Sequence, residues 1–275
     1  MIADSCIGVF DSGIGGLTVV KEIFSFIPDE RIVYFGDTAR VPYGSKSVDT
    51  VRRYAHEDTE LLLQHNPKLI VVACNTVSAV ALDVVKAHAG NIPVIGMIVP
   101  ACKEALGVSR TGKIGIIGTE ATISSKAYEI ELQSEAKRIG RNIETFAKAC
   151  PLFVPLAEEG WEDKFVAELI AREYLHSLHE ADIDTLILGC THYPVLSQVI
   201  QHVMGSNVTL INSGAVAARE VKMFEAAASG TKPDHLFLVS DIPRKFQSIG
   251  ERFLGYELPE IKQVVFDESW VMTTE

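Results

Sequence analysis

The stretch Leu69-Ile-Val-Val-Ala-Cys-Asn-Thr76 has the pattern of a buried strand followed by a small residue, a cysteine and two polar residues. The stretch Leu186-Ile-Leu-Gly-Cys-Thr-His192 has the same pattern. Ile7-Gly-Val-Phe-Asp11 and Ile114-Gly-Ile-Ile-Gly118 form a second, weaker pair. In both pairs the copies are separated by roughly a hundred residues, a spacing expected of two related halves. We therefore predict two similar units, each with a cysteine at the end of a buried strand.

Short apolar runs alternate with amphipathic stretches along most of the chain. We predict strands at residues 7–10, 32–35, 69–73, 94–95, 113–117, 144–147, 185–188 and 236–239. We predict helices at residues 16–26, 48–65, 77–89, 124–139, 164–181, 215–228 and 244–253. Continuous apolar strands that alternate with helices are typical of a parallel sheet covered on both faces. The predicted fold class is α/β, with two similar parallel-sheet domains.

The order of these elements also predicts where the domains begin and end. The segment after the second half is too short for a third full domain, so we expect it to return to the first half. The first domain is predicted to comprise residues 1–97 and 213–275, and the second residues 98–212. We expect the active site to lie between the two domains.

The composition of the 275 residues is that of a globular protein. Hydrophobic residues make up 47% and charged residues 22%, ordinary shares for a chain with a substantial core. The formal net charge of −11 disfavours nucleic acid as a partner. The longest apolar runs fall far short of the roughly 20 residues of a membrane helix, and no secretory signal is visible. We therefore expect a cytoplasmic protein with no membrane partner.

The five cysteines form no C-x-x-C pair, which argues against a structural zinc site and a disulfide framework. Cys74 and Cys190 precede residues that look like helix N-caps, and a helix N-terminus lowers the pKa of a thiol. We expect both thiols to be reactive. Cys6, Cys102 and Cys150 lack this repeated polar context, and we expect them to be small buried hydrophobes.

Polar clusters follow the predicted strands at the positions where parallel sheets bind their ligands. They are Asp11-Ser12-Gly13, the loop at residues 36–47, Cys74-Asn75-Thr76, Gly118-Thr119 and Cys190-Thr191-His192. The glycine-rich turn at residues 11–16 could bind an anion at a helix N-terminus, and Asp11 could cap that helix. The turn matches neither a P-loop nor a dinucleotide fingerprint. No cofactor or metal is predicted, since His176 and His179 fall on a charged amphipathic helix where solvated histidines are expected.

Two equivalent cysteines suit a proton-transfer reaction. Inverting a stereocentre requires a base on one face of the carbon and an acid on the other, and a cysteine can be either. A hydrolase with Cys190 as nucleophile and His192 as base is an alternative. That reaction would leave Cys74 unexplained.

Four motifs closely resemble those of the glutamate racemases, in the aspartate/glutamate racemase superfamily. They are Asp11-Ser-Gly-Ile-Gly-Gly-Leu-Thr18, Asp37-Thr-Ala-Arg-Val-Pro-Tyr-Gly-Ser45, Ala73-Cys-Asn-Thr76 and Cys190-Thr-His-Tyr-Pro194. The resemblance implies two α/β domains related by a pseudo-two-fold axis, usually in a homodimer. It also implies cofactor-independent interconversion of L- and D-glutamate, which supplies D-glutamate for peptidoglycan.

The resemblance further implies the roles of individual residues. Cys74, supported by Asp11, would act on the α-proton of D-glutamate. Cys190 would act on that of L-glutamate, supported by His192 and by one of the adjacent residues Glu158 and Glu159. The implied substrate-binding residues are Asp11, Ser12, Tyr43, Gly44, Ser45, Asn75, Thr76, Thr191 and His192. Because these clusters contain few cations, we expect backbone N–H groups to bind the carboxylates and Asp11 to accept the ammonium.

One segment departs from the family pattern. Where the family commonly has Ile-Glu-Pro-Gly, this chain has Ile98-Val-Pro-Ala101 followed by Cys102. Val99, Ala101 and Cys102 lie at the predicted crossing between the domains, so they bear on hinge or dimer contacts rather than on the chemistry. An aspartate or hydantoin racemase of the same superfamily and a non-enzymatic partner protein are the remaining alternatives.

Overall fold

Two parallel sheets organise the computed structural model, which describes residues 5–224, 233–242, 246–258 and 260–266. The first sheet has the order β10-β9-β2-β1-β3-β4 and the second the order β6-β5-β7-β8. The strands of the first sheet are β1 (Cys6–Asp11), β2 (Ile32–Gly36), β3 (Pro67–Val72), β4 (Val94–Gly96), β9 (Leu236–Val239) and β10 (Ile261–Gln263). Those of the second are β5 (Lys113–Gly118), β6 (Glu144–Ala149), β7 (Thr185–Gly189) and β8 (Thr209–Asn212). The α/β prediction is confirmed.

The two sheets repeat one strand order. The four strands β2-β1-β3-β4 of the first sheet correspond, strand for strand, to β6-β5-β7-β8 of the second. The central strands also pair alike, since Ile7 lies between Ile32 and Leu69, and Ile114 lies between Thr145 and Thr185. The sequence repeat therefore corresponds to a repeat of structure, with β3 and β7 carrying the two cysteines at their carboxyl ends.

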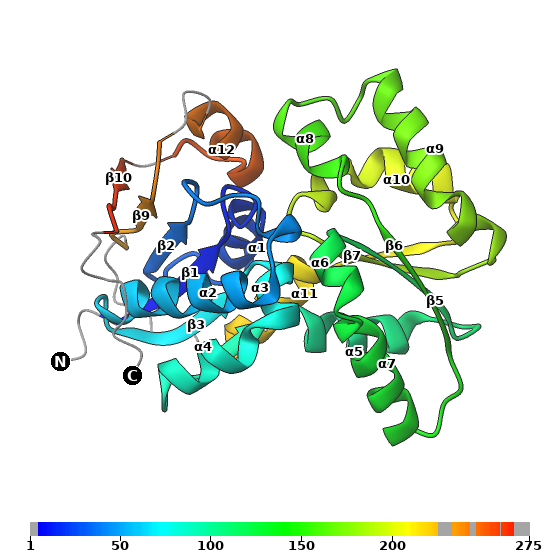
Figure 1. The fold of residues 1–275 in the computed structure, drawn as a ribbon, viewed down its shortest axis with the longest axis horizontal. Coiled ribbons are helices and arrows are strands. Elements are labelled where there is room, and N and C mark those ends of the chain that lie inside the picture. The colour runs from blue at the N-terminus through cyan, green and yellow to red at the C-terminus, as the bar shows by residue number, and fades with distance from the viewer. Residues whose placement is uncertain (1–4, 225–232, 243–245, 259, 267–275) are drawn as a thin grey trace.

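Helices cover both sheets (Figure 1). The helices on the side of the first sheet are α1 (Leu17–Phe26), α2 (Val48–Leu63), α3 (Asn75–Val80), α4 (Leu82–Ala89) and α12 (Phe246–Leu254). Those that follow β4 and precede β9 are α5 (Ile98–Val108), α6 (Glu120–Ser124), α7 (Ala127–Arg138), α8 (Phe153–Glu158), α9 (Phe165–Glu180), α10 (Ser197–Met204) and α11 (Ser213–Val221). Short 3-10 helices occupy Tyr43–Ser45, Tyr193–Leu196 and Lys222–Phe224.

The two halves are joined by packing as well as by the chain. One buried apolar cluster includes Leu17 and Val20 of α1, Ala217 of α11 and Leu186 of β7. Helix α11 contacts both α1 and α5, and Figure 1 shows it between the two sheets. The strands of the first sheet fall within residues 1–97 and 213–275, and those of the second within 98–212. Because α11 packs on both sides, the domain boundary near residue 213 stays a prediction.

Two of the predicted helices differ from those observed. The helix predicted at 77–89 is divided into α3 and α4 at Ala81, whose φ of −143° and ψ of 9° are not helical. The helix predicted at 124–139 corresponds to α7, which begins only at Ala127, after Lys126 with its positive φ of 57°. A residue outside the right-handed helical region breaks the hydrogen-bond ladder. Parts of the helices predicted at 215–228 and 244–253 lie outside the described residues.

Several elements were not predicted from the sequence. They are α5, α6 apart from its last residue, α8, α10, β8 and β10. Helix α8 has six residues and β10 only three partly exposed residues, so neither supplies enough periods of a hydrophobic pattern to be recognised. Val99, Ala101 and Cys102 belong to α5, where Ala101 and Cys102 are buried.

Candidate active site

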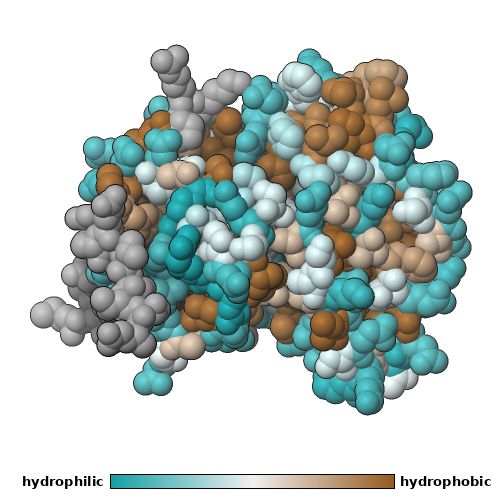
Figure 2. All heavy atoms as spheres, viewed as in Figure 1, coloured by the Kyte–Doolittle hydropathy of each residue, from teal (hydrophilic) through white to brown (hydrophobic). Residues whose placement is uncertain are grey.

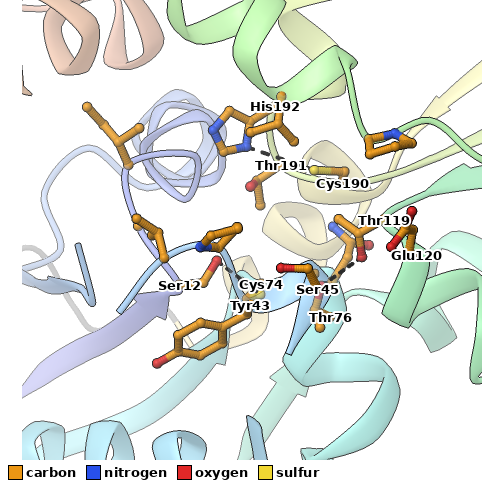
Figure 3. A pocket seen from close by; sticks show the side chains of 18 of the residues that line it. Ser12, Tyr43, Ser45, Cys74, Thr76, Thr119, Glu120, Cys190, Thr191 and His192 are labelled. Atoms are coloured by element: carbon orange, nitrogen blue, oxygen red, sulfur yellow. Dashed lines mark hydrogen bonds between the residues drawn. The ribbon is translucent and has the colours of Figure 1, made fainter. Parts of the chain in front are cut away.

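A cavity of about 400 Å³ lies where the carboxyl ends of the two sheets face each other. Of the predicted site residues, those that line it are Ser12, Tyr43, Gly44, Ser45, Cys74, Asn75, Thr76, Glu158, Cys190, Thr191 and His192. Cys74 and Cys190 enter the cavity from opposite sides (Figure 3). The turns after β1, β3 and β7 thus bring together groups that are far apart in the sequence.

Cys74 follows β3 and is the N-terminal capping residue of α3. Its sulfur is nearly fully buried and donates a hydrogen bond to Ser12 Oγ at 3.5 Å. Burial, followed by the nearby charge of Asp11, raises the pKa of the Cys74 thiol to about 12. The N–H of Val77 at the start of α3 does lower this pKa, as do hydrogen bonds from Ser12, but the loss of hydration outweighs them, so the expectation of a lowered pKa is wrong. The corresponding expectation for Cys190 stays a prediction.

Asp11 lies beneath the cavity at the end of β1, with only 1% of its surface exposed. One carboxylate oxygen accepts a hydrogen bond from Gly13 N at 3.0 Å. The other is buried without a hydrogen-bond partner in the described part of the chain. Burial raises the pKa of Asp11, opposed by the charge of His192 and by three backbone N–H groups. Asp11 is not the capping residue of α1, a position that Gly16 occupies.

Cys190, His192 and Glu158 form a chain of polar contacts on the other side of the cavity. The Cys190 sulfur lies 3.9 Å from His192 Nδ1, and His192 Nε2 lies 2.9 Å from Glu158 Oε1. Burial alone would lower the pKa of His192. The hydrogen bonds and charges of Cys190 and Glu158 outweigh that effect and raise the pKa to about 10. Of the two adjacent glutamates, Glu158 is the one whose carboxylate meets His192.

The loop before α2 is held by a buried charged network. The Tyr43 hydroxyl donates to Asp37 and, at 3.1 Å, to Asp58. The Arg40 guanidinium contacts both of these carboxylates and Glu57. Because its hydroxyl is bound here, Tyr43 borders the cavity with its ring and backbone rather than with its polar group (Figure 3). The network fixes the backbone of Gly44 and Ser45 at the cavity wall.

The amide and hydroxyl groups after β3 connect the two halves. Asn75 Oδ1 accepts a hydrogen bond from the Tyr128 hydroxyl at 2.6 Å. Asn75 Nδ2 is buried and has no partner within the described residues. Thr76 Oγ1 lies 3.0 Å from Thr119 Oγ1 and 3.3 Å from Thr122 Oγ1. Thus Asn75, which lines the cavity, has an unused polar atom that a bound molecule could satisfy, whereas Asp11 is not among the lining residues.

Comparison with known proteins identifies the family. Residues 10–221 match the family described as Asp/Glu/Hydantoin racemase. The chain belongs to this family.

Several relatives of this racemase chain match over nearly their whole length. A glutamate racemase of Chlorobaculum tepidum is 52% identical over 267 residues, which cover 95% of this chain and 97% of that protein. The structure of glutamate racemase from Francisella tularensis in complex with D-glutamate is similar with a TM-score of 0.88 and 39% identity, covering 96% and 98% of the two chains. The glutamate racemase of Thermus thermophilus, in complex with β-chloro-D-alanine, has a TM-score of 0.83 and 42% identity, covering 95% and 97%. The resemblance found in the sequence motifs is confirmed.

Nine further residues line the cavity: Gly13, Ile14, Val41, Pro42, Thr119, Glu120, Pro151, Val154 and Pro155. Gly13, Ile14, Val41, Pro42 and Thr119 lie in the polar clusters or motifs recognised in the sequence. Glu120, Pro151, Val154 and Pro155 were not predicted, because they belong to no recognisable motif. Among the described residues, no cluster of potential ligands suited to a metal ion is found, and no helix there is long and apolar enough to cross a membrane.

Apolar side chains gather on the surface beside α8 and α9. Figure 2 shows brown surface over this part of the molecule. Leu152, Trp161, Phe165 and Leu169 are all exposed, Phe165 by 73%. Exposed apolar patches of this kind are commonly covered by a partner.

Proposed function

We propose that this chain is a glutamate racemase that inverts the α-carbon by proton transfer between two cysteines, without a cofactor. The observation that carries the proposal is the pair Cys74 and Cys190, at equivalent strand ends on opposite sides of one cavity. One sulfur removes the α-proton while the other delivers a proton to the opposite face. Cys74 acts on D-glutamate and Cys190 on L-glutamate.

The neighbouring groups support different steps. The charge of Asp11, which lies next to Cys74, raises the pKa of the Cys74 thiol and so favours its protonated form. Glu158 holds His192, and protonated His192 stabilises negative charge on the Cys190 sulfur. Negative charge that develops on the substrate is stabilised by hydrogen-bond donors already oriented toward it.

The substrate is held mainly by uncharged groups. Among the described residues, Asn75 Nδ2 and one Asp11 oxygen have no hydrogen-bond partner. The Asn75 amide is a donor for a carboxylate, and the Asp11 oxygen is an acceptor for the ammonium. Backbone N–H groups of Gly44, Ser45 and Thr191, with the hydroxyls of Ser12 and Thr76, complete the site. Glutamate is preferred over aspartate or a hydantoin as substrate because relatives about as long as this chain and up to 52% identical are glutamate racemases.

The test is incubation with L-glutamate in deuterium oxide. We expect optical inversion together with deuterium at the α-carbon of the product. Aspartate and a hydantoin, assayed under the same conditions, should be poor substrates. Release of ammonia or another hydrolysis product without inversion would favour the Cys190–His192 hydrolase instead, and inversion of aspartate alone would overturn the choice of substrate.

Further properties belong to the same proposal. D-glutamate made by this reaction supplies peptidoglycan synthesis, and a cytoplasmic, reducing compartment keeps both thiols reduced.

The apolar patch of Leu152, Trp161, Phe165 and Leu169 supports a homodimer. Light scattering should give twice the chain mass of 30.1 kDa, and substitution of Phe165 by Ser should weaken the association if this patch is the interface.

A further inference from the structure

Helix α12 reaches from the first half of the molecule to the catalytic side chains of the second. It follows β9 and contacts α1. At its C-terminal end, the exposed Arg252 donates hydrogen bonds from Nη2 to Ala157 O at 2.5 Å and to Glu158 O at 2.9 Å. Both carbonyls belong to the last turn of α8, which faces α12 across the gap between the halves (Figure 1).

These two carbonyls are suited to a guanidinium group. The last carbonyls of a helix have no partner within the helix, and they form its negative end. The turn after α8 also leaves room for the side chain. Gly160 has a φ of +68°, and a Cβ atom at this position would lie 2.7 Å from Arg252 Nη1. The end of α8 is thus shaped around Arg252.

Glu158 is the last residue of α8, the helix whose end Arg252 holds. The Glu158 side chain is 40% exposed, yet its carboxylate meets His192 Nε2 at 2.9 Å. The next residue of α12, Phe253, places its ring edge-on to the His192 ring, with centroids 5.5 Å apart and an angle of 87° between the planes. Adjacent residues of α12 therefore support both members of the Glu158–His192 pair.

We propose that Arg252 is a positioning residue for the Cys190 half of the reaction. It fixes the end of α8 so that Glu158 holds His192 with Nδ1 toward the Cys190 sulfur. Arg252 is not among the residues that line the cavity. Because Cys74 depends instead on Ser12 and Asp11, loss of Arg252 impairs proton abstraction at Cys190 far more than at Cys74. This inference rests on the proposed racemase function.

Racemisation itself cannot reveal this asymmetry, because L- and D-glutamate have equal free energies and kcat/KM must change equally in both directions. Elimination from β-chloroglutamate avoids the constraint. One sulfur removes the α-proton, the Cα–Cβ double bond forms, and chloride leaves with the electron pair of the C–Cl bond. The resulting enamine tautomerises to an imine, which water hydrolyses to 2-oxoglutarate and ammonium. Each enantiomer then reports on one cysteine, and the reaction is irreversible.

The experiment compares Arg252→Ala, Arg252→Lys and Gln247→Ala with the unaltered chain. We expect Arg252→Ala to lower kcat/KM for elimination from the L-enantiomer about tenfold, as for the loss of a charged hydrogen-bond donor. Elimination from the D-enantiomer should change by less than about twofold, within the scatter of surface substitutions. Arg252→Lys keeps a charged donor and should recover part of the L-rate. Gln247 is exposed on the same helix and bonds to Glu251, so its substitution should change neither rate.

A double substitution tests whether Arg252 acts on Cys190 through Glu158 and His192. If Arg252 acts through Glu158 and His192, Arg252→Ala should add little to the loss already caused by His192→Asn. Equal losses for both enantiomers in Arg252→Ala and in the milder Arg252→Lys, or no loss in either, would overturn the inference. So would full additivity with His192→Asn. An unaltered chain that fails to racemise glutamate would instead overturn the proposed function.

Discussion

Cys74 and Cys190 occupy equivalent positions but have different chemical neighbours. The pKa of Cys74 is raised to about 12, first by burial and then by Asp11, so this thiol keeps its proton at neutral pH. The pKa of His192 is raised to about 10 by its bonds to Cys190 and Glu158, against the effect of burial, so a cation lies beside the Cys190 sulfur. In the proposed mechanism, a protonated thiol at Cys74 and a cation-supported sulfur at Cys190 are the arrangement from which the reaction of L-glutamate begins.

Substitution of each cysteine should separate removal of the α-proton from inversion of the α-carbon. Cys74→Ser and Cys190→Ser should each abolish most racemisation, because inversion needs a group on both faces of the carbon. Each variant should still eliminate chloride from the enantiomer of β-chloroglutamate that faces its remaining cysteine. Cys190→Ser should therefore process the D-analogue, and Cys74→Ser the L-analogue, as measured by 2-oxoglutarate formation. Cys102→Ser, at a buried cysteine outside the cavity, provides the control. Elimination from the same enantiomer by both variants would contradict the two-base assignment.

The dependence of kcat/KM on pH should be bell-shaped, because the reaction needs one deprotonated and one protonated group in the free enzyme. His192 loses its proton as the pH rises through about 10, and its support of the Cys190 sulfur is lost with it. We therefore expect the alkaline limb near that pH, measured by the loss of optical rotation with L-glutamate. His192→Asn should displace this limb, whereas Gln247→Ala should not. A rate that still rises at about pH 11 would contradict the role of the His192 cation.

The sequence could predict which residues meet at the site but not their ionisation. The four motifs located Asp11, Cys74, Cys190 and His192, because strand ends in parallel sheets converge on one edge. The raised pKa of Cys74 depends on how completely the tertiary structure removes water from its sulfur, and no local motif contains that information. The same limit explains why Arg252 was missed, since its partners Ala157 and Glu158 lie about a hundred residues away.

The turn between β1 and α1 packs closely against the turn after β7. Thr18 Oγ1 donates to Thr191 O at 2.8 Å. A Cβ atom on Gly15 would lie 2.3 Å from Thr191 Oγ1 and 2.6 Å from His192 Nδ1. Since these turns belong to different halves, their close approach sets the position of His192 relative to the first half.

Gly15→Ala should therefore damage catalysis. The new methyl group must displace one of the two turns, and a displacement of about 1 Å at reacting groups can lower the rate about a hundredfold. Steady-state kinetics with both enantiomers of glutamate would measure the loss. Gly107→Ala is the matched control, because a Cβ atom there meets nothing within 4 Å. Near-normal kcat/KM in Gly15→Ala would show that the contact between the turns is not required.

The lengths of the elements determined how well the sequence predicted them. Long periodic segments such as α2 and α9 were found, with ends that differ from the prediction by one or two residues. The break at Ala81 and the positive φ of Lys126 before α7 were not predicted, because an alanine and a lysine are both good helix formers.

At the scale of the whole molecule, the sequence repeat predicted more than the individual elements did. The two Cys-containing strands indicated related halves, and the sheets β2-β1-β3-β4 and β6-β5-β7-β8 have the corresponding order. The order β10-β9-β2 at one edge of the first sheet could not be predicted, since β9 and β10 have no counterpart in the second sheet. The carboxyl ends of both sheets point toward the cavity, so residues at the amino ends can contribute to stability without touching the site.

Asp184 illustrates that division, since it lies at the amino end of β7, opposite the cavity. Its carboxylate accepts hydrogen bonds at 2.7 Å from Ser109 Oγ, Arg110 N and Thr111 N, in the loop before β5. Burial would raise the pKa of Asp184, but these bonds outweigh it and hold the pKa well below the usual value. Asp184 thus ties two neighbouring strands of the second sheet together at their starts.

Asp184→Asn should lower stability while sparing catalysis. The amide presents N–H groups to backbone donors, which should cost about 1 to 3 kcal/mol in the free energy of unfolding. Because the folded pKa is depressed, the stabilisation from Asp184 is present above the unfolded pKa of about 3.9 and is lost as the pH falls below it. Urea unfolding between about pH 3 and pH 7 should therefore show a gap between the original chain and Asp184→Asn that narrows toward acid. Asp163→Asn, at an exposed carboxylate, should show no such gap. If Asp184→Asn lowered kcat/KM at a temperature where the protein stays folded, the separation of the stabilising end of the sheet from its catalytic end would be wrong.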